Sequence, residues 1–120
     1  MADMDNRGYT QGAAADVNIP AANTAAVITY AAVSGKRHAI SGIAYSYSAA
    51  PTGGNLKIED VAGTTIFSLD ITAAGPGDPI YFDPAKGNAL PNTALIITLA
   101  AGGVGISGKV NVLGHWLTGS

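Results

Sequence analysis

Histidine and aspartate are the side chains of this chain that could bind a metal ion or transfer a proton. The two histidines, His38 and His115, could converge with Asp70, Asp78 or Asp83. A zinc site needs three or four ligands, which usually recur at short, characteristic spacings. The spacing of these residues matches no such signature, so we predict no metal site. We interpret His38 as a residue at the rim of the fold, where a strand ends, and His115 as a surface residue on the polar face of the last strand.

The glycine-rich segment Gly103–Lys109 matches two phosphate-binding patterns, Gly-x-Gly-x-x-Gly and Gly-x-x-x-x-Gly-Lys. Both motifs bind phosphate through backbone N–H groups at the start of a helix. The residues that follow are typical of a strand, and Val110 stands where a P-loop has the Ser or Thr that binds Mg²⁺. No acidic residue follows Asp83 to bind a ribose. We therefore predict no cofactor, and we interpret the segment as a strand packed closely against another backbone.

The chain offers little for nucleophilic catalysis. It contains no cysteine, which excludes a thiol nucleophile, a thiolate metal site and a disulfide. The Gly-x-Ser-x-Gly sequence that places a serine nucleophile on a sharp turn is absent as well. We predict no catalytic residues and expect that the protein is not an enzyme.

Five aromatic residues could form a stacking platform for sugars or bases: Tyr30, Tyr45, Tyr47, Tyr81 and Trp116. Single aromatic residues in alternating segments more often pack in a core or an interface. We therefore predict packing, with the platform as the alternative.

The elements that must position these residues are predicted to be short strands, because β-branched and aromatic residues alternate with polar ones between turn signals. The expected strands are Ala26–Val33, Lys36–Ser48, Leu56–Val61, Thr64–Ile71, Pro79–Asp83, Thr93–Ala100 and Val104–Leu117. Gly42 predicts a bulge inside the second of them. Ala62 and Gly63 predict a two-residue hairpin loop. The sequence thus predicts an all-β fold of antiparallel strands, arranged as a sandwich or a barrel.

The alternation also predicts which side chains face the core. Phe67, Leu69 and Ile71 are expected to point inward from one strand, and Val104 is expected on the apolar face of the last strand. The segment Thr93–Ala100 is nearly all apolar, which is typical of a central strand covered on both sides.

The first 25 residues differ from the rest, because they show no apolar period of either strand or helix. We predict an extended N-terminal arm over 1–25 and a β-sandwich domain over 26–120. The arm needs its own body or a neighbouring chain to order it. Tyr9, Val17 and Ile19 are its apolar anchors and our candidates for interface residues.

Charged residues make up only 12% of the chain, about half the usual share. Such a surface is typical of a protein covered by partners, or of one rich in Ser, Thr and Gly. The net charge is −2, and the few lysines and arginines are not clustered into a basic stripe, so we expect no nucleic-acid partner. No apolar run is long enough to span a membrane, and the first residues do not resemble a signal peptide.

The stretch Gly53–Leu117 resembles a group of small virion proteins of tailed bacteriophages. Four segments carry the resemblance: Gly54–Asp60, Ile66–Gly77, Leu99–Gly103 and Gly108–Val112. The resemblance covers roughly the last 65 residues and leaves the arm outside. It implies a single jelly-roll or sandwich domain that decorates capsids or forms fibre and spike modules, often as a trimer. It implies no catalytic residues.

We therefore expect a structural protein that binds and stabilises a phage capsid as a decoration (cement) protein. Its expected partners are the major capsid protein and further copies of itself, as a trimer, with neither nucleic acid nor membrane. Its expected location is the capsid surface, after synthesis in the host cytoplasm. The arm is expected to contact neighbouring subunits. The alternative is a carbohydrate- or receptor-binding fibre or spike module, which predicts exposed aromatic residues clustered at one end of the sandwich.

Overall fold

The computed structural model describes residues 17–61 and 63–118, the last five of these by their backbone alone. Nine strands and no helix occur in this part of the chain. Their bounds are β1 Val17–Asn18, β2 Ala26–Tyr30, β3 Lys36–Tyr47, β4 Gly54–Asp60, β5 Thr65–Ile71, β6 Gly75–Pro76, β7 Ile80–Gly87, β8 Leu95–Leu99 and β9 Gly108–Thr118.

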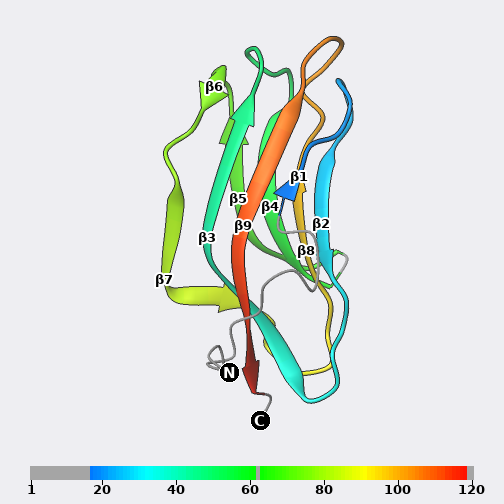
Figure 1. Cartoon of the computed structure of the whole chain (residues 1–120), viewed down its shortest axis with the longest axis vertical. Helices are drawn as coiled ribbons and strands as arrows, with labels where there is room; N and C mark the ends of the chain where they lie inside the picture. The colour runs from blue at the N-terminus through cyan, green and yellow to red at the C-terminus, as the bar shows by residue number, and fades with distance from the viewer. Residues whose placement is uncertain (1–16, 62, 119–120) are drawn as a thin grey trace, which may run out of the picture.

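The strands form two antiparallel sheets (Figure 1). Sheet A has the order β1–β9–β3, with both β6 and β7 on the far side of β3, and sheet B has the order β2–β8–β4–β5. Each strand pairs with its counterpart on the other side of the β4–β5 hairpin: β1 with β9, β2 with β8, and β3 with β6 and β7. A long hairpin folded in this way is a jelly roll, in which β6 and β7 together act as one edge strand. The predicted fold class is confirmed.

The core lies between the two sheets, where the inward side chains of both meet. In β2 and β8 every second residue is buried, which is the period of a strand with one face on a core. The cluster of buried apolar residues comprises Ala26, Ile28, Tyr30, Ile40, Ile43, Tyr47, Leu56, Ile58, Ile71, Leu95, Ile97, Leu99, Val110 and Val112. The other face of β8 is only half-buried, so the expectation that this strand is covered on both sides is wrong.

The predicted bulge in β3 is confirmed. The register of β3 shifts between Ile40 and Gly42 against both β7 and β9. The ring of Tyr81 lies over Gly42, because a Cβ built at Gly42 would lie 3.3 Å from Cδ1 of that ring. Glycine at this bulge therefore leaves room for the edge of the Tyr81 ring on the outer surface of sheet A.

The predicted β4–β5 hairpin is confirmed, with a connection that is longer than expected. The strands end at Asp60 and begin again at Thr65, and the Asp60 amide donates to the Thr64 carbonyl at 2.8 Å. Val61 and Gly63 both have positive φ angles, 60° and 92°. These left-handed residues end the strands one position earlier than alternation alone indicates.

The expected bounds of the last strand and of β7, and the expected place of Val104 on an apolar face, are wrong. The last strand begins at Gly108, because Gly103 and Gly105 have φ angles of 114° and 75° that a strand cannot continue through, and Val104 is 90% exposed at the tip of their turn. β7 continues to Gly87, beyond the expected end at Asp83. Leu69 points to the core side as expected, yet it is 36% exposed because β5 is the edge strand of sheet B.

Candidate interaction surfaces

The outer face of sheet A carries an apolar surface that is built by the pairing of β7, β3 and β9. The register aligns Tyr81, Gly42 and Leu113 in one row across these strands. The next row contains Ala44 and, through their common partner Asn111, Val17 of β1. We call Val17, Ala44, Pro79, Tyr81 and Leu113 the apolar face.

Four residues of the apolar face are exposed: Tyr81 to 76%, Leu113 to 43%, Val17 to 42%, and Pro79. A shallow groove of about 290 Å³ lies between Tyr81 and Leu113, with Gly42 and Ala44 in its lining. Most single exposed apolar residues need no explanation, but a contiguous group around a groove is typical of a contact site. The apolar face can therefore receive an uncharged partner surface.

The structure places the predicted interface residues differently from one another. Val17 lies in β1 and pairs with Asn111 of β9, so its backbone is held by the protein's own sheet. Ile19 follows β1, outside any strand, and is 64% exposed. Tyr9 lies outside the described residues. The protein's own sheet A therefore holds Val17–Asn18 in place through β9. This pairing of β1 with β9 lies beside the groove of the apolar face.

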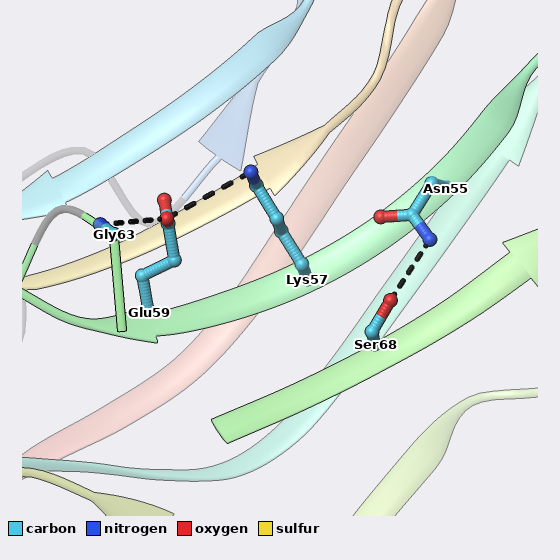
Figure 2. A network of polar contacts seen from close by, with 5 residues as sticks. All are labelled: Asn55, Lys57, Glu59, Gly63 and Ser68. Carbon is cyan, nitrogen blue, oxygen red and sulfur yellow. Dashed lines mark hydrogen bonds and ion pairs between the residues drawn. The ribbon is translucent and has the colours of Figure 1, made fainter. Parts of the chain in front are cut away.

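The outer face of sheet B is polar over β4 and β5 (Figure 2). Asn55 Nδ2 donates to Ser68 Oγ at 3.0 Å and to Asp70 Oδ1 at 2.9 Å. Glu59 accepts a hydrogen bond from the Gly63 amide at 2.9 Å and forms an ion pair with Lys57 at 3.7 Å. These side chains bond one another along the surface, so this part of sheet B contrasts with the apolar face.

His38 is buried, 4% exposed, and the expectation that it lies at the rim is wrong. Its Nε2 donates to the Ala31 carbonyl at 2.7 Å, since a carbonyl oxygen can only accept. Its ring stacks on that of Tyr30 with centroids 5.4 Å apart. These contacts fix the imidazole as part of the core. The side chain of His115 lies outside those described, and the described residues contain no group of three or more potential metal ligands.

Asn88, the other buried polar residue, ties the β7–β8 connection to β3. Its Oδ1 accepts from the His38 amide at 2.9 Å, and its own amide donates to the His38 carbonyl at 2.9 Å. Its Nδ2 donates to Asp60 Oδ1 at 2.7 Å and to the Ala94 carbonyl at 2.9 Å. Every polar atom of this side chain has a partner, which is typical of a structural group rather than a binding group.

The predicted packing of the aromatic residues is confirmed for three of them. Tyr30 and Tyr47 are 5% and 1% exposed, and Tyr45 is half-buried against the core. Tyr81 is exposed, and the side chain of Trp116 lies outside those described. A stacking platform therefore cannot include Tyr30 or Tyr47.

The glycine-rich segment Gly103–Lys109 forms a turn followed by the start of β9, as its strand-like continuation predicted. A Cβ at Gly108 would lie 2.9 Å from Cδ2 of Leu99, and the Tyr47 ring is 3.1 Å away. Close packing is therefore what Gly108 permits, although its neighbours are side chains and not the backbone that we expected.

Two exposed residues of the apolar face, Leu113 and Tyr81, were not among the predicted site residues. Both stand at outward positions of their strands, Leu113 beyond Asn111 and Tyr81 between Ile80 and Phe82. A large apolar residue at an outward position is the signal that could have found them.

Comparison with known proteins adds no relative: no protein-family model matches the chain, and no curated protein matches it. Within the residues described, no helix is long and apolar enough to cross a membrane.

Proposed function

We propose that this protein is a structural virion protein that binds and stabilises a phage capsid as a decoration protein. The observation that carries the proposal is the apolar face of sheet A, with Tyr81 and Leu113 exposed around a groove and Val17 exposed in the neighbouring row. A jelly roll presents such a face on a rigid, two-layered support. The resemblance of Gly53–Leu117 to small virion proteins of tailed phages supports the same function.

The attachment of the arm supports a contact with neighbouring subunits. β1 lies at the edge of sheet A, and Val17 shares the outer surface with Ala44 and Leu113. The chain that precedes Val17 therefore starts next to the apolar face. In the proposed assembly the apolar face binds the major capsid protein, and the arm, with Tyr9 and Ile19, contacts neighbouring copies in a homotrimer.

The test of the capsid contact is binding to shells of the major capsid protein encoded together with this chain. Leu113→Asp places a charge on the apolar face and should weaken binding at least about tenfold, which corresponds to about 1.4 kcal/mol. Val27→Asp is the matched control, because Val27 is 41% exposed on the outer face of sheet B, close to the 43% of Leu113. Equal binding by the two variants would show that the apolar face is not the capsid contact.

The test of the arm is a pair of deletions. Removal of residues 1–16 keeps β1, whereas removal of 1–24 also uncovers the edge of β9 that Val17 and Asn18 pair with. We expect the shorter deletion to reduce both capsid binding and oligomer size while leaving the thermal unfolding of the sandwich unchanged. If capsid binding and oligomer size both stay as in the full chain, the arm does not contact neighbouring subunits.

A further inference from the structure

The edges of the two sheets differ in how far they are protected from pairing with another strand. On sheet A, β1 covers part of β9, and the opposite edge is interrupted by Pro76, Pro79 and Pro84, which have no N–H to donate. On sheet B, β2 is contacted by β1 and β9 of the other sheet. Prolines, lysines and covering strands are the usual protection of an edge.

Along Thr65–Ile71, β5 has no proline, lysine or covering strand, although a shift in its pairing with β4 places a bulge at Ile66 near its start. The segment contains no proline, lysine or arginine, and no other strand in the described part of the chain pairs with its outer edge. An edge strand of this length presents a row of backbone donors and acceptors that can pair with another chain.

Apolar side chains are also accessible along this edge. Phe67 and Leu69 face the core side, because their partners Ile58 and Leu56 are fully buried, yet Phe67 is only half-buried and Leu69 is 36% exposed. A groove of about 170 Å³ lies beside Leu69, and Tyr45 forms part of its lining. A strand added to β5 would cover these side chains and extend the core.

The sequence of β5 is complementary to itself. In an antiparallel pair centred on Ser68, this residue lies opposite its own copy on the two-fold axis. Phe67 then lies opposite Leu69 on the core side in two symmetry-related pairs, and the two Asp70 carboxylates lie on opposite sides of the axis, apart from each other. Apolar cross-strand pairs stabilise a sheet, whereas like charges opposite each other destabilise it.

We propose that β5 pairs antiparallel with β5 of a second copy, about a two-fold axis at Ser68, to form one continuous sheet from the two sheets B. Such a contact is isologous, since the same strand is used on both sides. The proposed pairing of β5 with β5 does not depend on the capsid function. The homotrimer proposed above needs contacts about a three-fold axis, and it would use the arm and not β5.

The first test is the mass of the full chain in solution by light scattering. Leu69→Lys places an inward-pointing charge on the edge and should reduce the mass at least to half, by separating the two copies joined through β5. Leu90→Lys is the control, because Leu90 is 69% exposed in the β7–β8 connection, and it should keep the mass of the unchanged protein. Equal masses of both variants and of the unchanged protein would overturn the proposal.

The second test leaves the apolar side chains of β5 unchanged and introduces a single cysteine. The chain contains no native cysteine, so any disulfide must form at the introduced position. Ser68→Cys places two thiols opposite each other on the axis, where the Cα atoms of an antiparallel pair are about 4.5–5.5 Å apart, within the range of a disulfide. With oxidised glutathione we expect a disulfide-linked dimer. Asp70→Cys on the same strand places its two thiols about 13 Å apart and should not cross-link. No cross-link at Ser68, or equal cross-linking at both positions, would show that this pairing does not form.

Discussion

At the scale of the residue, Tyr47 shows how one polar group is accommodated in an apolar core. Its side chain is 1% exposed, and its hydroxyl donates to the Ala100 carbonyl at 2.6 Å. Burial raises the pKa of the Tyr47 phenol above its ordinary value of 10.0, and a backbone hydrogen bond with Asn55 acts in the opposite direction. The folded protein therefore retains this proton at a pH where the unfolded chain begins to lose it.

This shift predicts an alkaline loss of stability that is specific to Tyr47. The contribution is fully present below pH 10 and is lost as the pH rises from there towards the folded pKa. At neutral pH, Tyr47→Phe should lower the free energy of unfolding by about 1 kcal/mol, the net value of a hydrogen bond. Above pH 10 the difference between the variant and the unchanged protein should shrink.

Urea unfolding at neutral and at alkaline pH measures both effects. Tyr81→Phe is the control, because Tyr81 is 76% exposed, and this variant should follow the pH dependence of the unchanged protein. A difference between Tyr47→Phe and the unchanged protein that stays constant across pH would contradict the assignment to the Tyr47 proton.

At the scale of the element, the β7–β8 connection depends on the hydrogen bonds of Asn88 to β3 and to Asp60. Asn88→Ala removes the acceptor of the buried His38 amide, whereas the Ala94 carbonyl keeps its hydrogen bond from the Val61 amide. A buried group left without a partner costs about 1–3 kcal/mol, so we expect a loss of that size in the free energy of unfolding. Asn55→Ala is the matched control, because Asn55 also donates two side-chain hydrogen bonds but at the surface. Denaturant unfolding that gives equal losses for both would mean that burial does not decide the cost.

The same connection explains which parts of the structure the sequence could predict. Alternation is local, so it located β3, the β4–β5 hairpin and the bulge at Gly42 from neighbouring residues. Asn88, 50 residues later, binds the backbone of the buried His38, and no local pattern contains that contact. The apolar face has the same origin: Val17 was predicted as an anchor, but the row of Tyr81, Gly42 and Leu113 exists only through the pairing of β7, β3 and β9.

At the scale of the whole molecule, the two outer faces of the sandwich differ in chemistry. On the outer face of β4 and β5, Asn55 donates a hydrogen bond to Ser68, and Lys57 forms an ion pair with Glu59. The residues of the apolar face carry no charge. The protein as a whole has a net charge of only −2. If the apolar face binds the capsid, as we propose, the contact is driven by burial of apolar surface and not by long-range attraction.

This origin predicts how capsid binding responds to salt. Raising sodium chloride from about 0.1 M to about 1 M shortens the Debye length from about 10 Å to about 3 Å, which weakens contacts between exposed charges. We expect the dissociation constant for capsid shells to change by less than about threefold, since apolar burial is not screened, and sodium sulfate should tighten binding because it strengthens apolar burial. Binding measured by co-sedimentation over this range distinguishes the two origins. If the affinity for capsid shells fell tenfold or more as sodium chloride was raised, the contact would be assigned to charged residues and not to the apolar face. Lys86 and Lys109, which are exposed on β7 and β9, are such residues.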